Sequence, residues 1–183
     1  MYSHMNNPMA GQTKNVQNYI SATFPDGHTE ILFTPLAPFE TPEALDRICE
    51  EYNKVIGNME LEPLIAIPIF IHDFLCIHPF NDGNDRMSRL LTTLLLYRSG
   101  FYVGKYISLE AKIAKNKDLY YDALNRAQHG WHEGTEDAVP FIIAIFKNKA
   151  NSRRNGTSLS SQKAKLSEKH IVSRSEEHPG SVP

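Results

Sequence analysis

"CIHPFNDGNDRMSRLL", residues 76–91, decides the fold because a polar bend here joins two apolar segments. Pro79 disfavours helical geometry at the preceding residue, so an apolar helix must end at His78. Residues 81–84 are Asn, Asp, Gly and Asn, which tolerate left-handed backbone, and a helical pattern resumes at about Asp85. A plain connector between two helices needs no histidine, no acid and no pair of arginines. The composition of the bend therefore indicates a functional loop.

The side chains of this bend suit a phosphate-containing ligand. Backbone N–H groups of such a turn and of the helix that follows form an anion-binding nest. Arg86 and Arg89 lie three residues apart and can share one face, where their forked donors match phosphate oxygens. Asp82 offers a carboxylate to Mg²⁺, and His78 is a proton acceptor near pH 7. Together these residues predict phosphate-group transfer to a hydroxyl that the histidine deprotonates.

Helical signals dominate on both sides of the bend. Thr41 precedes Pro42, which predicts a helix start with Thr41 as a side-chain cap. Further upstream, β-branched and aromatic residues flank Pro-Asp-Gly at residues 25–27, which is typical of a short hairpin. The pattern predicts a hairpin over about residues 19–36, helices over about 41–57, 60–77, 85–99, 117–129 and 137–149, and a short piece capped by Ser108. We therefore predict an all-α fold with one short β-hairpin.

Bulk composition narrows the class of protein. The 183 residues are 41% hydrophobic and 22% charged, which is the balance of a soluble globular domain. A net charge of −2 gives no strong signal for nucleic-acid binding. The two cysteines, Cys49 and Cys76, predict no disulfide framework and favour a reducing compartment. The apolar run that begins at Leu64 is too short to span a bilayer, so we predict a cytoplasmic protein without a membrane span.

Composition also divides the chain into three parts. Residues 1–16 are polar and without apolar periodicity, and we predict a flexible N-terminal arm there. Residues 17–149 carry the predicted hairpin and helices and form the domain. Residues 150–183 contain no aromatic side chain and eight serines, so they cannot bury enough apolar surface to offset the entropy of ordering. This last part is predicted to be a disordered tail or the remnant of a missing region.

The nine residues "HPFNDGNDR", residues 78–86, resemble the signature of Fic-family proteins, His-x-Phe-x-(Asp/Glu)-Gly-Asn-(Gly/Lys)-Arg. The similarity continues through "MSRLL", and "YYDAL" from Tyr120 and the upstream hairpin extend it over about residues 17–149. The resemblance implies an all-α fold. For most members it also implies transfer of AMP from Mg·ATP to a Ser, Thr or Tyr hydroxyl of a target protein (AMPylation), with release of pyrophosphate.

The resemblance gives roles to the bend residues. His78 would be the general base that takes the proton of the target hydroxyl. Asp82 would hold Mg²⁺ between the α- and β-phosphates of ATP. Gly83 and Asn84 would shape the anion hole, and Arg86 would hold the β-phosphate of the departing pyrophosphate.

The same resemblance extends beyond the bend. Arg89 would contact the γ-phosphate, and Tyr121 and Gln128 would line the adenine pocket. The hairpin resembles the flap that clamps a target segment as an added strand. Its target-binding residues would be Ile31, Leu32 and Phe33.

Asp85 departs from the signature, because the family has glycine there, or lysine in the Doc branch. A carboxylate ~4 Å from a phosphate charge costs on the order of 4 kcal/mol before screening at an effective dielectric of about 20. Alternatively, Asp85 caps the following helix as its N-cap residue, or recruits metal. We favour the cap, and we keep Asp85 among the residues around the nucleotide.

Control of the activity is a second departure. Many members carry an inhibitory helix with the pattern (Ser/Thr)-x-x-x-Glu-(Gly/Asn), whose glutamate pairs with the second arginine. Ser173 has Glu177 four residues later, but His178 follows where glycine or asparagine is needed, which we interpret as a chance match. The inhibitor would then lie on a separate partner or on sequence missing from this chain, or be absent.

Three alternatives stay open at this stage. The chain could be a Fic-like module that binds a nucleotide or a partner with weak or no turnover, because Asp85 replaces the motif glycine. It could catalyse a different family reaction, such as deAMPylation, phosphotransfer or use of another nucleotide. Finally, His72-Asp73 is similar to the paired ligands of HD-type metal phosphohydrolases. Further ligands would have to come from His129, His132 and Asp137.

Overall fold

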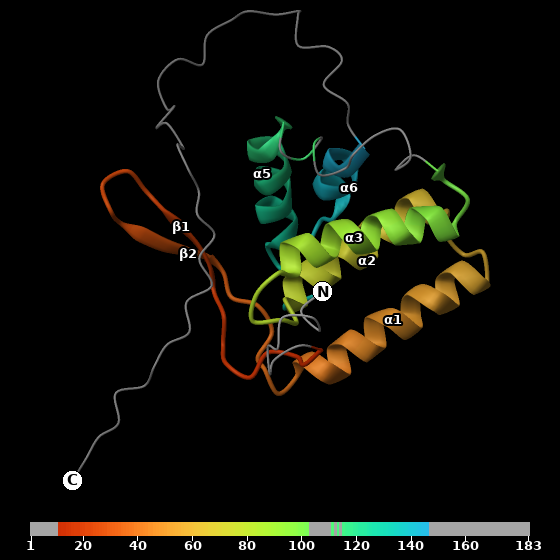
Figure 1. Ribbon diagram of the computed structural model, residues 1–183, viewed down its shortest axis with the longest axis horizontal. Helices are drawn as coiled ribbons and strands as arrows, with labels where there is room; N and C mark the ends of the chain where they lie inside the picture. The colour runs from red at the N-terminus through yellow and green to blue at the C-terminus, as the bar shows by residue number, and fades with distance from the viewer. Residues whose placement is uncertain (1–10, 103–110, 112, 114, 147–183) are drawn as a thin grey trace, which may run out of the picture.

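The computed structural model describes residues 11–102, 111, 113 and 115–146. The elements in this part of the chain are β1 (Ile20–Thr23), β2 (Thr29–Phe33), α1 (Thr41–Gly57), α2 (Pro63–Ile77), α3 (Asn84–Arg98), α5 (Lys117–Gln128) and α6 (Val139–Phe146), as Figure 1 shows. The predicted all-α fold with one short hairpin is confirmed. The piece capped by Ser108 and the tail over 150–183 lie outside the described residues.

The hairpin is antiparallel and carries a bulge. Gly27 supplies the left-handed residue of its turn, with φ 84°, where a side chain would be strained. Ile20 pairs with Phe33 and Ser21 pairs with Ile31, so Leu32 is an extra residue on β2. A bulge interrupts the alternation of side chains along a strand. Phe33 can therefore turn toward the helices while Ile31 faces solvent.

Helix α2 is the centre of the helical part. It is apolar on nearly all sides, as expected for a helix with neighbours all round, and it contacts α1, α3, α5 and α6. In Figure 1, α1 and α3 run beside α2, and the hairpin projects away from the helices. The helix begins with Pro63 in its first turn and ends at Ile77, directly before the bend. None of the helices in the described ranges is long and apolar enough to cross a membrane.

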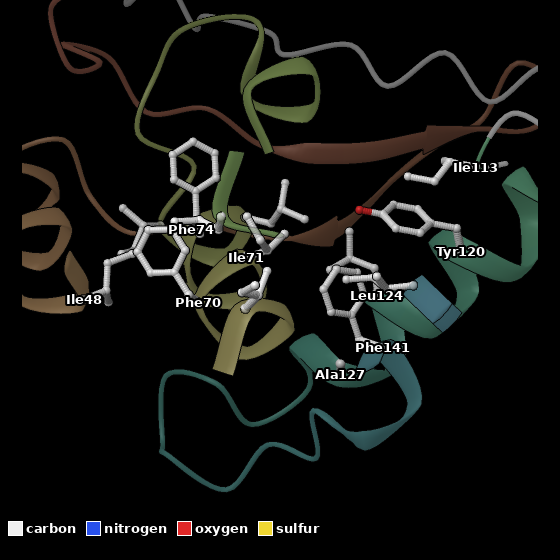
Figure 2. Close-up of a cluster of buried hydrophobic side chains, with 14 of the residues drawn as sticks. Ile48, Phe70, Ile71, Phe74, Ile113, Tyr120, Leu124, Ala127 and Phe141 are labelled. Carbon is white, nitrogen blue, oxygen red and sulfur yellow. The ribbon is translucent and has the colours of Figure 1, made fainter. Parts of the chain in front are cut away.

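The core fixes the position of α2. Side chains of α1, α2, α5 and α6 point toward one another in Figure 2, and Phe141 and Ile71 are 0% and 1% exposed. Full burial of one such side chain stabilises the fold by about 1.5–3 kcal/mol. Because the last turn of α2 is buried as well, the histidine that follows it is held at a defined place.

The start of α1 differs from the prediction at one residue. Glu40, not Thr41, is the N-cap residue, and no side chain caps this helix. Thr41 is fully buried, and its hydroxyl donates to the Ala37 carbonyl oxygen at 2.8 Å. The hydroxyl faces the preceding turn instead of the free N–H groups, so the predicted cap at Thr41 is wrong.

Candidate active site

The bend between α2 and α3 has left-handed backbone at both of its ends. His78 terminates α2 with φ 52° and ψ 62°, while its N–H donates to the Phe74 carbonyl oxygen at 3.0 Å. Gly83 precedes α3 with φ 84° and is its N-cap residue. The left-handed conformation costs a residue other than glycine roughly 1–2 kcal/mol, so surrounding contacts must hold His78 in it.

The imidazole of His78 is held in one tautomer. Its Nδ1 lies 3.3 Å from the Leu75 carbonyl oxygen. Because a carbonyl only accepts hydrogen bonds, Nδ1 carries the proton and Nε2 keeps its lone pair. The pKa of His78 is lowered to about 4, mainly by burial and also by the charge of Lys14, while the Leu75 hydrogen bond, Asp85 and Asp82 oppose the shift. The ring is therefore neutral and able to accept a proton at pH 7.

Asn84 holds the inside of the bend together. Its Oδ1 accepts from the Phe80 N–H at 2.9 Å, and its Nδ2 donates to the Phe80 carbonyl oxygen at 2.6 Å. The side chain is 1% exposed, so these bonds are shielded from water. The Phe80 ring packs against the core, 6.3 Å from the Phe74 ring between centroids. Asn84 thus shapes the loop through the peptide groups of Phe80.

Arg86 and Arg89 of α3 each pair with the carboxylate four residues before them. Arg86 Nη2 lies 3.1 Å from Asp82 Oδ2, and both side chains are substantially exposed, at 46% and 74%. Arg89 pairs with Asp85 one turn along the helix, and the Arg89 side chain is only 16% exposed. Two acids and two arginines therefore stand at the N-terminus of α3, where the first N–H groups of a helix have no acceptor within the helix.

Asp85 does not cap α3. Gly83 is the N-cap residue, and Asp85 lies in the first turn with its carboxylate directed at Arg89. The same oxygen, Oδ2, accepts a hydrogen bond from the Tyr121 hydroxyl of α5 at 3.0 Å. Burial, Asp85 and the hydrogen bond raise the pKa of Tyr121. The cap that we favoured for Asp85 is therefore wrong, because the carboxylate bonds to Arg89 on its own helix and to Tyr121 on α5.

The two residues expected near adenine separate in the structure. Tyr121 joins the bend through Asp85. Gln128, the last residue of α5, is 4% exposed, and its Nε2 has no hydrogen-bond partner among the described residues. It interacts with the buried Cys76 thiol of α2, in the interior of the domain.

The hairpin is anchored to the helices at its base. Phe33 is 8% exposed and stacks on His132, with 5.5 Å between ring centroids. His132 Nε2 donates to the Thr34 carbonyl oxygen at 2.9 Å, and Trp131 Nε1 donates to Asp73 Oδ1 at the same distance. Ile31 is 55% exposed on β2. Of the three predicted flap residues, Phe33 is thus an anchor, Leu32 forms the bulge and Ile31 is available to a partner.

His72 and Asp73, the candidate ligands of an HD-type metal site, make contacts with other side chains. His72 is 1% exposed, with Nε2 3.6 Å from the Cys76 thiol, and its ring packs on Phe141. Asp73 accepts the Trp131 hydrogen bond. Within the described ranges, no three His, Cys, Asp or Glu side chains come together in a way that could hold a metal ion. His72 is therefore part of the core packing, and the partly exposed Asp73 binds Trp131.

A small cavity of about 120 Å³ lies between α1 and α2, far smaller than a nucleotide site needs. Its lining includes Ile48, Tyr52 and Phe70 but no residue of the bend. This cavity is therefore separate from the bend.

Lys14 is a residue of the site that sequence reasoning missed. Lys14 lies within the arm predicted over residues 1–16, and it is 3% exposed and donates from Nζ to the Ile77 carbonyl oxygen at 2.9 Å. A lysine in a polar stretch carries no periodic signal, so nothing in the sequence distinguishes it. The predicted domain boundaries stay predictions.

The fold and the bend define a class of protein: a helical domain with a hairpin flap and a His-Pro-Phe loop that opens a helix. The sequence profile of the Fic/DOC family matches residues 2–96, and the chain belongs to that family.

Individual relatives share about a third or less of their residues with this chain over the matched segments. The chain is 29% identical over 129 residues to a Fido domain-containing protein of Dictyostelium discoideum, covering 65% of this chain and 86% of that protein. It is 32% identical over 139 residues to the protein adenylyltransferase fic-1 of Caenorhabditis elegans, covering 76% of this chain but 23% of that protein. The chain therefore spans less than a quarter of the length of the C. elegans relative.

Solved structures support the fold. A Fic domain containing signaling protein from Bacteroides thetaiotaomicron superposes with a TM-score of 0.54 at 22% identity, covering 74% of this chain and 48% of that one. A Fic family protein from Desulfovibrio desulfuricans gives a TM-score of 0.51 at 24% identity, covering 75% and 39%.

Proposed function

We propose that this protein transfers AMP from Mg·ATP to a Ser, Thr or Tyr hydroxyl of a target protein and releases pyrophosphate. The observation that carries the proposal is the state of His78. Its Nδ1 is bound to the Leu75 carbonyl oxygen at 3.3 Å, so Nε2 is the proton acceptor, and this base stands beside the N-terminus of α3. Membership of the Fic/DOC family and relatives named protein adenylyltransferase agree with this function.

In this proposal the residues of the bend divide the work. His78 Nε2 takes the proton of the target hydroxyl, whose oxygen attacks the α-phosphorus while the bond to the β-phosphate oxygen breaks. Arg86 and Arg89 hold the phosphates that leave as pyrophosphate, so each must exchange its carboxylate partner for phosphate oxygens. Gly83 and Asn84 keep the N–H groups of the loop and of α3 directed at the same place.

Mg²⁺ enters as part of the co-substrate. A Mg²⁺ ion bound by phosphates needs one or two protein carboxylates, and Asp82 is 74% exposed at the edge of the bend, which fits that demand. The ion neutralises phosphate charge. Asp82 would orient it after releasing Arg86.

The target would bind along β2. Hydrogen bonding to the open edge of a strand gives affinity, and an exposed side chain such as Ile31 gives specificity. Tyr121 and Gln128 remain our candidates for the adenine side of the site. We also propose a cytoplasmic location, on the basis of the two free thiols of Cys49 and Cys76.

Labelled ATP in a lysate tests the reaction. Protein that retains label from α-labelled ATP, but not from γ-labelled ATP, indicates transfer of AMP; the reverse indicates phosphotransfer. His78→Ala is expected to lower the transfer by roughly 10²–10⁴-fold without unfolding the domain. His129→Ala, at an exposed position after α5, is the matched control. Full transfer by the His78 variant would disprove the assigned base.

A second candidate function rests on the Asp85–Arg89 pair. A carboxylate that already neutralises Arg89 opposes a triphosphate, which favours a nucleotide-binding module with weak or no turnover. Calorimetry that detects nucleotide binding, together with no label transfer to any lysate protein, would favour this function over AMPylation.

A further inference from the structure

Residues 14–18 contact four consecutive carbonyl groups of the bend. Lys14 Nζ donates to the Ile77 carbonyl oxygen at 2.9 Å, and the Lys14 N–H donates to that of Pro79 at 2.7 Å. Asn18 Nδ2 lies 3.2 Å from the Phe80 carbonyl oxygen and 3.5 Å from that of His78. We call residues 14–18 the brace, because every main-chain oxygen from residue 77 to residue 80 faces a donor on it.

The brace is itself fixed in place. Lys14 Nζ also donates to Asn18 Oδ1 at 3.1 Å, and both side chains are buried, at 3% and 4% exposure. Gln17 Nε2 donates to the Pro35 carbonyl oxygen at 2.9 Å, which ties the brace to the segment after β2. Burying an ammonium group is costly unless it is well hydrogen-bonded, and burial lowers the pKa of Lys14 to about 8. The cost of burying the Lys14 ammonium group is consistent with a role for this contact in fixing the backbone of the bend.

The contacted groups decide where the imidazole of His78 lies. The residue adopts an unfavourable left-handed conformation, and the orientation of its flanking peptides sets the direction of its side chain. The ammonium of Lys14 also sits at the C-terminus of α2, where the helix dipole favours a positive charge. Without these donors, the peptides of residues 77–80 could relax toward a more favourable turn and move Nε2.

We propose that Lys14, together with Asn18, is a positioning residue for the transfer reaction: it fixes the bend so that the His78 imidazole points at the incoming hydroxyl. This inference rests on the proposed function of His78 as the base. The charge of Lys14 has a second effect, since it disfavours the positively charged imidazolium form of His78. The charges of Asp85 and Asp82 act in the opposite direction and favour that form.

The test compares Lys14→Met with Lys54→Met, a change of an exposed lysine on α1. A misplacement of about 1 Å in a catalytic group costs on the order of 10²-fold, so kcat for label transfer is expected to fall roughly 10–100-fold, with an unchanged Kd for ATP. Lys14→Arg, which keeps the charge and donors, should recover part of the loss. A kcat for Lys14→Met that equals the wild-type value would overturn the proposal. The proposal would also be overturned if unfolding of part of the Lys14→Met protein accounted for the whole loss of kcat.

NMR separates this proposal from the proposed function. The titration of the His78 ring and the amide shifts of His78 and Phe80 are expected to change in Lys14→Met and not in Lys54→Met, with the His78 pKa moving upward. These signals can be read even if the wild-type protein transfers nothing, in which case the function fails while the positioning stands. If Lys14→Met does not fold, Asn18→Ala serves, because it removes the donor to the Phe80 and His78 carbonyl oxygens and keeps the Lys14 bonds to Ile77 and Pro79. Unchanged His78 signals in the folded variant would refute the positioning role.

Discussion

The Tyr121 hydroxyl donates a hydrogen bond to Asp85 Oδ2 at 3.0 Å, across 36 residues of sequence. Asp85 stands where the Fic signature has glycine, and it also pairs with Arg89. The residue that departs from the signature is therefore integrated into the site, with partners on both α3 and α5. An arginine that the proposed reaction needs for phosphate is occupied by an internal anion.

Asp85→Asn should tighten ATP binding, because it removes the charge that opposes phosphate while keeping the shape of the side chain. Asp85 is 38% exposed, so screening reduces the effect to about 1 kcal/mol, or roughly fivefold in Kd. Calorimetry with Mg·ATP measures it, with Asp46→Asn on α1 as the control. Asp85→Gly should likewise increase label incorporation. Unchanged or weaker binding in Asp85→Asn would show that the carboxylate does not compete with nucleotide.

The lowered pKa of His78 should make the stability of the domain depend on pH. The pKa of this histidine is about 4 in the folded protein, below the value of about 6.5 for a free histidine. Between these values the unfolded chain binds more protons, so this residue's contribution to stability falls as the pH drops from about 6.5 to 4. Urea unfolding at pH 7 and pH 4.5 should show a smaller decrease for His78→Ala than for the wild type. Equal decreases would contradict the depressed pKa.

The pH dependence of activity should follow the same residue. The base must be neutral, so kcat/KM should not respond to His78 above about pH 5.5 and should fall tenfold per pH unit below about pH 4. Rates of label transfer over pH 3.5–8, corrected for the folded fraction, measure this. A midpoint near 6.5 would indicate an imidazole with ordinary solvation.

Asn84→Ala should destabilise the domain. The change leaves the Phe80 N–H without its acceptor, and the Phe80 carbonyl oxygen keeps only the Asn18 donor, at a cost of roughly 1–3 kcal/mol. Urea unfolding measures the loss, and Asn53→Ala on the exposed side of α1 is the control. Should both variants unfold alike, the two hydrogen bonds would contribute nothing to stability.

The hairpin variants should separate anchoring from recognition. Phe33→Ala removes a buried ring and should cost roughly 3 kcal/mol of stability. Ile31→Ala alters an exposed side chain and should leave stability within about 0.5 kcal/mol. If β2 binds the target, Ile31→Ala raises the KM for the target protein while the Kd for ATP is unchanged. An unchanged KM would mean that the target does not use this side chain.

Local signals in the sequence were sufficient for much of the fold. Helices α1 and α5 begin and end within about one residue of their predicted limits, because proline, glycine and apolar spacing are local properties. The bend was predictable for the same reason: Pro79 ends one helix, and Gly83 permits the backbone that starts the next.

Tertiary contacts decided the features that the sequence did not reveal. An aspartate in the first turn of a helix is compatible with a cap, and only the approach of Tyr121 from α5 turns Asp85 away from that role. Lys14 is buried because residues 77–80 offer it carbonyl oxygens from more than sixty residues away. The bulge at Leu32 depends on the register between β1 and β2, and the residues of these two short strands do not specify that register by themselves.

The acceptor that sets the tautomer of His78 belongs to the main chain of α2, since it is the Leu75 carbonyl oxygen. Any residue that keeps this helical turn supplies the same oxygen. A substitution at position 75 therefore leaves the protonation of the His78 ring unchanged. A histidine that is oriented by a carboxylate side chain is different, because one substitution can remove that carboxylate. Drift at position 75 would affect core packing and leave the proton on Nδ1.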